Sequence, residues 1–359
     1  MWPSWSDTLP SSGGQRLEEG GQRLVGQYKI GTADEPLVSY ITVVKNNAAL
    51  LPRALESVRM QTYQMVEHIV LDGASTDDSV DVLRRNDSTL AYYASEPDNG
   101  LYHALNKAIP LARGSVICVL NSDDWLEPEA AQIAVNCLTG KTCALLATSV
   151  QFGSVLLWSP IPVHPGTYFS CMHICHNGVY ATNEAYERSG PYDASYKVTA
   201  DFKWVMTCVD KNIEFVYSDI KTMNFSCGGI SGNVRQNALD TMRVIQERFP
   251  FLRVNEIQGL YYSFYRNIGS FAPFLDFGPP EDLRAFIKKL LLQYADRTEF
   301  ITALSWALWE KYVDMAQLQD VSPSARLPSG LREGIKTMLR GTALFEPCKR
   351  IYRGLTVRF

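Results

Sequence analysis

The sequence lacks several features that would place it in common classes of protein. Its 359 residues contain no run of about 18 apolar residues, which a membrane-spanning helix needs. Its first residues hold neither the basic region nor the apolar stretch of a secretory signal. A net charge of −4 argues against a general nucleic-acid binder. The eight cysteines show no framework spacing, which favours reduced thiols and a cytoplasmic setting.

What is present is an ordinary globular composition with three zones. The apolar fraction is 46% and the charged fraction 20%, and the length suits one large domain with an appendage. Residues 1–35 are rich in Gly, Ser, Gln and charge, and we expect a flexible or appended N-terminal arm. Residues 36–235 carry mixed strand and helix patterns. From residue 236 the pattern is helical, which predicts a helical extension over 236–359.

The first half of the middle zone alternates between strands and helices. Apolar, β-branched runs predict strands at 37–44, 68–71, 90–93 and 115–120, with helices at 50–61, 77–85 and 101–111. This order is typical of βαβ units and a mainly parallel sheet. Polar clusters follow three of the strands, at 45–47, 72–73 and 123–124. Open α/β sheets bind ligands at the carboxyl ends of their strands, so these clusters predict the site.

Two adjacent carboxylates, Asp123 and Asp124, end the strand at 115–120. Such a pair is costly to bury unless a cation compensates it. A hard divalent cation prefers carboxylate oxygens and often holds the phosphates of a substrate as well. The alternative is a turn and helix N-cap before residues 126–129, because Asp caps helices well and Pro suits the first turn. Both interpretations stay open on the local sequence.

The second half is less regular. Residues 144–148 and 154–158 predict strands, paired antiparallel, and helices are expected near 184–188 and at 200–209. In the first half, Ser75 and Asp78 have the spacing of an N-terminal capping signal for the helix expected at 77–85. Asp201 could likewise cap the helix that follows it.

Eight different short motifs follow one another along the chain. They are residues 61–63 (QTY), 69–77 (IVLDGASTD), 96–108 (EPDNGLYHALNKA), 120–124 (LNSDD), 175–178 (CHNG), 190–193 (GPYD), 200–202 (ADF) and 228–231 (GGIS). In this order they resemble family 2 glycosyltransferases, the inverting sugar transferases of bacterial polysaccharide assembly. The resemblance implies the GT-A fold, a Rossmann-like mixed sheet flanked by helices. It also implies a nucleotide-diphosphate sugar as donor, UDP-linked by default.

The resemblance assigns donor-binding roles to six residues. They are Val43, Asn46, Asp72, Asn99, Lys107 and Asp123. Asp72 would meet the nucleobase, since a carboxylate can accept the imide N–H of uracil. The family often has a second aspartate after this one, where Gly73 stands here. Asn99 and Lys107 would approach the diphosphate, although a lysine on a solvated helix face is an alternative.

The resemblance also assigns the chemical roles. Asp124 would coordinate Mn²⁺ or Mg²⁺ bridging the diphosphate, and Asp123 would reach the ribose or donor sugar. A cation offsets the charge that develops on the departing nucleotide. Asp201 would be the general base that takes the proton from the acceptor hydroxyl. His176 would line the acceptor side.

Other interpretations compete with this one. Cys171, His173 and Cys175 would share one face of a strand and could chelate zinc, but no second ligand pair follows. A sugar nucleotidyltransferase would need a Gly-rich basic loop after the first strand, which residues 45–47 do not form. A nucleotide-sugar-binding module without catalysis would lack a carboxylate, whereas the chain keeps all four. A nicotinamide dehydrogenase is disfavoured because no G-x-G-x-x-G follows the first strand.

The C-terminal residues 331–359 contain seven Lys or Arg and two Glu, a net charge of +5. Apolar residues alternate with these cations, which predicts either contact with anionic lipid or an ordinary packing helix. Lipid contact would place the protein at the inner face of the membrane and make a lipid-linked saccharide acceptor plausible beside a free glycan. Residues 227–232 predict a glycine-rich loop that closes over the donor or simply connects two elements.

Overall fold

The chain forms two compact units. The computed structural model describes residues 6–8, 16–154, 156–171, 173–226, 229, 232–266 and 268–318, the last seven by backbone only. The first unit ends at Gly278 and the second begins at Pro279. This division falls later than the boundary expected near residue 235, because the first helices of the extension pack within the first unit.

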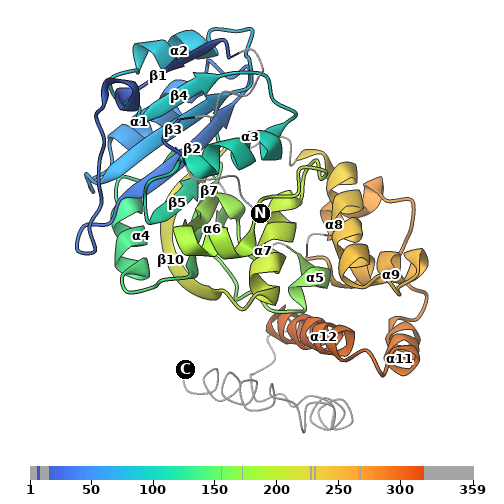
Figure 1. The fold of residues 1–359 in the computed structure, drawn as a ribbon. Coiled ribbons are helices and arrows are strands. Elements are labelled where there is room, and N and C mark those ends of the chain that lie inside the picture. Colours follow the sequence, from blue (N-terminus) through green and yellow to red (C-terminus); the bar gives the residue numbers. More distant parts are fainter. Residues whose placement is uncertain are drawn as a thin grey trace. The chain divides into compact units, whose positions relative to one another are not determined.

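A ten-stranded mixed sheet runs through the first unit (Figure 1). Its order is β1-β4-β3-β2-β5-β9-β7-β10-β6, and β8 pairs with β7. The strands are β1 (Glu18–Gly20), β2 (Val38–Val44), β3 (Val66–Asp72), β4 (Tyr92–Ser95), β5 (Val116–Val119), β6 (Trp125–Leu126), β7 (Ala144–Phe152), β8 (Leu156–Trp158), β9 (Val179–Thr182) and β10 (Glu214–Phe225). Strands β4, β3, β2 and β5 are parallel, so their carboxyl ends meet at one edge. The predicted α/β class is confirmed.

The helices follow the predicted alternation in the first half and dominate after residue 233. They are α1 (Leu51–Arg59), α2 (Ser79–Arg85), α3 (Leu101–Ala108), α4 (Ala130–Leu138), α5 (Thr167–Ser170), α6 (Asn183–Ser189), α7 (Ala200–Asp210), α8 (Val234–Arg248), α9 (Val254–Phe264), α10 (Ile268–Phe271), α11 (Leu283–Gln293) and α12 (Thr298–Leu318). Short 3₁₀ turns include η1 (Gln22–Val25), η2 (Ile109–Leu111), η3 (His176–Gly178) and η5 (Ala272–Phe274). Among the described residues, no helix is both long and apolar enough to cross a membrane. The basic residues 331–359 lie outside the described part of the chain.

The N-terminal segment is built onto the sheet. Strand β1 pairs antiparallel with β4, and the turn η1 inserts the buried side chain of Arg23. Arg23 donates to Glu67 Oε2 at 2.8 Å and to the carbonyl oxygen of Leu111 at 2.7 Å. Ser39 donates to the other oxygen of Glu67 at 2.5 Å. Strand pairing and these buried hydrogen bonds join this segment to the domain.

Strand β10 was not predicted, although it is the longest strand in the described residues. Its first half is partly exposed and carries polar residues, so local preference gives little signal. Parallel pairing with β7 holds it, with register shifts between Ser218 and Lys221 and between Lys221 and Met223. The strand matters because it delivers Ser226 to the carboxylate pair.

Three predicted helix caps are wrong. Helix α4 begins at Ala130, after the short strand β6, so the Asp123–Asp124 pair does not cap it. Ser75 does not cap α2, because this helix begins at Ser79 after the N-cap residue Asp78, and no capping side-chain hydrogen bond forms there. Asp201 lies inside the first turn of α7, whose N-cap is Thr199. Asp124 is instead held by contacts with the distant residues Asn177 and Ser226.

The strand geometry expected for a zinc site is also wrong. Cys171 follows α5 with a φ of 52°, and η3 begins directly after Cys175, so Cys171 and residues 173–175 lie outside any strand. Side chains in this loop do not share one face as they would on a strand.

His68 is a buried histidine at the centre of the sheet. Its Nε2 lies 2.9 Å from Thr42 Oγ1, whose own proton goes to the carbonyl oxygen of Leu120 at 2.7 Å. The imidazole must therefore donate from Nε2. Burial lowers the pKa of His68 from 6.5 to about 3, so the folded protein keeps this ring neutral.

This burial predicts acid sensitivity. Between pH 6.5 and 3 the unfolded chain binds a proton at His68 that the folded protein does not, so the free energy of unfolding falls as pH drops. His68→Gln keeps a donor for Thr42 and removes the titration. The free energy of unfolding, measured with urea at pH 7 and pH 4.5, should fall by about 2 kcal/mol less in the variant than in the wild type. An equal fall in both proteins would show that other groups cause the loss of stability at low pH.

Candidate active site

Polar loops that follow β2, β3 and β5 interlock at the carboxyl edge of the sheet. The main-chain N–H of Asn46 donates to Ser75 Oγ at 2.7 Å, and the N–H of Thr76 donates to Asn46 Oδ1 at 2.8 Å. Asn47 Nδ2 donates to Ser122 Oγ at 2.9 Å, beside the carboxylate pair. Asn46 has a φ of 53°, a conformation that asparagine tolerates better than most residues. The edge predicted to carry the site is therefore one connected network.

Asp72 holds the loop after β3. Its Oδ2 accepts the N–H of Ser75 at 2.9 Å and the hydroxyl of Ser95 at 2.6 Å, and Oδ1 accepts the hydroxyl of Ser75 at 2.5 Å. The residue is 1% exposed. Both oxygens are engaged inside the fold, which differs from the expectation that this carboxylate itself meets a base.

Asp124 is buried in a cage of three hydrogen-bond donors. Oδ1 accepts the main-chain N–H of Ser226 at 2.7 Å. Oδ2 accepts Asn121 Nδ2 at 3.1 Å and Asn177 Nδ2 at 2.5 Å. Burial raises the pKa of Asp124 to about 7, although the three hydrogen bonds lower it, and the neighbouring charge of Asp123 adds to the rise. The carboxylate is thus held in place by its donors, and the second negative charge of Asp123 lies beside it.

Asp123 lies beside this cage with its side chain only partly buried. Its main-chain oxygen accepts Arg53 Nη2 at 2.7 Å and Ser226 Oγ at 2.6 Å. The Arg53 guanidinium also stacks 3.7 Å over the ring of Trp125. Within the described residues no side chain donates to the Asp123 carboxylate. Nothing in the local sequence distinguishes Arg53 from any other cation on a helix.

One short segment lies near both the Asp124 cage and Asp201. Asn177 donates to Asp124, and His176 Nε2 shares a 2.7 Å hydrogen bond with the hydroxyl of Tyr192. Burial raises the pKa of the Cys175 thiol to about 12, and the charges of Asp124 and Asp201 both add to it. Burial lowers the pKa of His176, while Asp201 opposes that shift. Residues 175–177 therefore bring the two carboxylate sites together.

Asp201 lies next to a tyrosine of helix α3. Its Oδ1 accepts the N–H of Phe202 at 2.8 Å and lies 3.3 Å from the hydroxyl of Tyr102. The Tyr102 hydroxyl donates to the carbonyl oxygen of Val198 at 2.5 Å. Burial and the charge of Asp201 raise the pKa of Tyr102 well above 10, so the hydroxyl keeps its proton.

Asp240 of α8 anchors the chain that leads into α7. Its Oδ2 accepts the main-chain N–H groups of Lys197 and Val198 at 2.9 and 2.8 Å. Its Oδ1 accepts Gln236 Nε2 at 2.7 Å. The side chain is buried. The extension thus contributes to the position of Asp201, which no local motif predicted.

The other expected site residues are placed differently. Lys107 pairs with the buried carboxylate of Glu96, so its ammonium is engaged within the fold rather than exposed for a phosphate. Asn99 lies in an exposed turn, where its N–H reaches His103 Nδ1 at 3.4 Å. Val43 is buried in β2. Of the expected donor residues, Asn46 and Asp72 lie in the connected network and Asp123 borders it.

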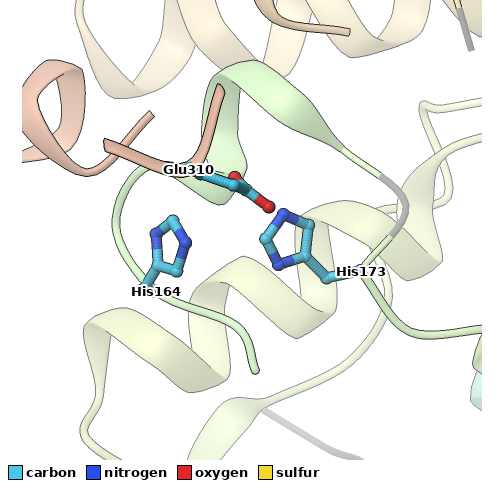
Figure 2. A group of neighbouring side chains, drawn as sticks. All are labelled: His164, His173 and Glu310. Carbon is cyan, nitrogen blue, oxygen red and sulfur yellow. The ribbon is translucent and has the colours of Figure 1, made fainter. Parts of the chain in front are cut away.

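A pair of histidines lies in the loop around α5, and their rings approach edge to face in Figure 2. The ring centroids of His164 and His173 are 5.2 Å apart. His173 Nδ1 lies 2.9 Å from the carbonyl oxygen of Pro162, and Nε2 lies 2.8 Å from Ser170 Oγ. His164 Nδ1 accepts the N–H of Gly166 at 3.0 Å. These bonds tie the loop to itself.

The comparison with protein families agrees with this geometry. Residues 39–172 match the model of glycosyl transferase family 2. These residues form a glycosyl transferase family 2 domain. The matched region includes strands β2–β5, helix α3 and the Asp123–Asp124 pair. The protein is a glycosyltransferase, as the order of motifs predicted.

Relatives carry the same description. An uncharacterized glycosyltransferase of Mycobacterium tuberculosis is 29% identical over 231 residues, covering 60% of this chain and 86% of that protein. A PGL/p-HBAD biosynthesis glycosyltransferase of Mycobacterium bovis is 27% identical over 181 residues, covering 48% of this chain and 70% of its own.

Solved structures confirm the fold. Residues 1–349 of TarS from Staphylococcus aureus align with a TM-score of 0.51 at 16% identity, over 77% of this chain and 91% of that one. The same protein in complex with UDP aligns with a TM-score of 0.50 at 14% identity. This likeness supports the predicted GT-A architecture.

The anchor at Asp240 generates a prediction. Asp240→Ala leaves two buried N–H groups without acceptors and should lower the free energy of unfolding by about 1–3 kcal/mol. Displacement of Asp201 should also lower transfer by about tenfold or more. Asp240→Asn keeps one acceptor oxygen and should retain most of both properties. Urea unfolding and a transfer assay measure the two effects.

Glu247 offers a matched control on the same helix. Its partly exposed carboxylate pairs with Lys203 at 2.6 Å and Arg243 at 2.9 Å. Glu247→Ala should cost less than about 1 kcal/mol, because exposed ion pairs contribute little. If Asp240→Ala were as mild as this control, the anchor would have no role in placing Asp201.

Proposed function

We propose that this glycosyltransferase is metal-dependent and inverting, and that it moves a sugar from a nucleotide-diphosphate sugar to an acceptor hydroxyl. The observation that carries the proposal is the segment 175–177, which lies near both the Asp124 cage and Asp201. Inversion requires stabilisation of the leaving group on one face of the sugar and a base for the acceptor hydroxyl on the other, and we assign these roles to the Asp123–Asp124 pair and to Asp201.

The donor is proposed to bind at the carboxyl edge of β2–β5. The loop network around Asn46 and Asp72 lies there, and Asp123 borders it. A UDP-sugar is the default donor, and the likeness in fold to a protein solved with UDP agrees with this choice. Lys107 takes part only if it leaves Glu96, since the two are paired.

Asp123 and Asp124 fit a divalent cation. Their ligand atoms are oxygens, which Mn²⁺ and Mg²⁺ prefer, and their two negative charges are adjacent. Among the described residues neither carboxylate forms an ion pair with Lys or Arg. Asp124 would hold the cation and Asp123 would lie toward the donor. When bound, the cation would stabilise the charge of the departing nucleoside diphosphate.

Asp201 is proposed as the general base. Oδ1 is held by Phe202 and Tyr102, whereas Oδ2 accepts no hydrogen bond in the described part of the chain. Oδ2 can therefore take the proton of an acceptor hydroxyl that attacks from the side opposite the leaving group. His176, held by Tyr192, would border the acceptor.

The acceptor is proposed to be a glycan or a lipid-linked saccharide. One support is that a relative is named for PGL/p-HBAD biosynthesis. The other is the charge of +5 over residues 331–359, which suits a cytoplasmic protein at an anionic membrane surface.

Two substitutions test the chemistry. Asp124→Ala should abolish release of nucleoside diphosphate from UDP-, GDP- and dTDP-sugars with Mn²⁺. Asp201→Asn should keep donor binding, measured by thermal shift, and lower turnover by about a hundredfold or more. Asp219→Asn changes an exposed carboxylate on β10 and is the control. Full turnover in Asp201→Asn would refute the base. Donor binding without any turnover in the wild type would favour a binding module.

Flotation tests the membrane interaction. The full chain should float with liposomes containing anionic lipid, and a variant ending at residue 330 should float less, because it lacks the basic residues. Neutral liposomes and high salt are the controls, since both weaken electrostatic attraction. Equal flotation by the two proteins would remove the tail from the proposal.

A further inference from the structure

Gly73 lies where the family motif often has a second aspartate, and another residue fills the space of that missing side chain. A Cβ placed on Gly73 would lie 2.3 Å from Oδ2 of Asp98 and 3.1 Å from its Cγ. Lys45 Cδ would lie 3.5 Å away on the other side. The Asp98 carboxylate therefore packs directly on the Cα of Gly73.

Residue 73 is a glycine because the Asp98 carboxylate takes up the space of a side chain, and not because the backbone needs a special conformation there. Gly73 does not adopt a positive φ, whereas the next residue, Ala74, has a φ of 57°. The N–H of Gly73 makes an ordinary bond to the carbonyl oxygen of Val44 at 2.8 Å. A larger residue at 73 would displace the carboxylate of Asp98. The loop after β4 thus supplies a carboxylate next to the place where the motif would have its own.

Asp98 is held so that one oxygen stays unengaged. Oδ1 accepts the N–H of Gly100 at 2.7 Å, at the start of α3. Oδ2 points over Gly73 and accepts no hydrogen bond from the residues that the structure describes. Asp72, the neighbouring carboxylate, has both oxygens occupied and is buried. Of these two carboxylates only Asp98 offers an acceptor at the surface.

We propose that Asp98 reads the donor nucleobase by accepting a ring N–H at Oδ2. This inference rests on the proposed function, because it assumes a nucleotide donor at this edge. Uracil and thymine present N3–H, and guanine presents N1–H, so each can donate to a carboxylate. Cytosine and adenine carry an unprotonated ring nitrogen at that position, which would face the carboxylate acceptor to acceptor. The aliphatic stem of Lys45 beside Gly73 gives the base an apolar flank.

The test is a change in base selectivity. Asp98→Asn should still accept the N–H of Gly100 through its amide oxygen, while its NH₂ replaces Oδ2. Isothermal titration with UDP and CDP, each with Mn²⁺, measures the ratio of the two Kd values. The wild type should prefer UDP, and Asp98→Asn should lower that preference by about tenfold or more, because a donor then faces N3–H of uracil and N3 of cytosine.

Gly73→Ala provides a second variant that leaves Asp98 itself intact. The added methyl group must displace the carboxylate, so UDP binding should weaken with little change for CDP. Asp81→Asn, an exposed carboxylate on α2, is the matched control and should keep the wild-type ratio. A purely structural effect would weaken both nucleotides alike and would not change their ratio.

The outcomes separate the two proposals. If the wild type binds UDP, dTDP or GDP and Asp98→Asn keeps the wild-type ratio of the Kd values for UDP and CDP, only the role of Asp98 is overturned. If the wild type prefers CDP or ADP, the role of Asp98 is overturned as well. No binding of any nucleoside diphosphate refutes the proposed function itself. Tighter binding of one among UDP, dTDP and GDP identifies the nucleotide.

Discussion

The cage around Asp124 is the interaction on which the rest of the site depends. Its three donors come from distant parts of the chain: Asn121 after β5, Asn177 in η3 and Ser226 after β10. A buried carboxylate costs free energy unless such donors compensate it. The cage therefore requires that the parallel half, the antiparallel half and strand β10 all be in place. The site exists only when the whole sheet is assembled.

Helix α3 connects the two halves of the domain in a similar way. Tyr102 reaches Val198 and Asp201, and Asn106 exchanges two hydrogen bonds with the backbone of Tyr192 at 2.8 and 2.9 Å. The helix begins directly after the loop that carries Asp98. A shift of the loop that carries Asp98 would therefore be transmitted to Asp201, the proposed base. Rigid elements, rather than loops alone, set the distance between the reacting groups.

Much of this arrangement could be predicted from sequence, because it rests on local patterns. The alternation of strands and helices, and the polar residues that follow β2, β3 and β5, appear directly in the chain. Asp98, Arg53 and Asp240 could not be singled out, since their roles arise from contacts between segments far apart in sequence. Strand β10 was missed because it forms by pairing with β7 and has little preference of its own. Motifs predicted which loops meet, while tertiary contacts decided which oxygen in each loop is free.

The N-terminal segment has a consequence for anyone who shortens this protein. A version that starts near residue 36 would retain the whole family 2 match yet leave Glu67 buried without Arg23. It would also uncover the edge of β4, which β1 now pairs. An exposed edge strand offers free N–H and C=O groups to other chains. Aggregation of such a fragment would reflect this lost cover, and would say nothing about the catalytic domain itself.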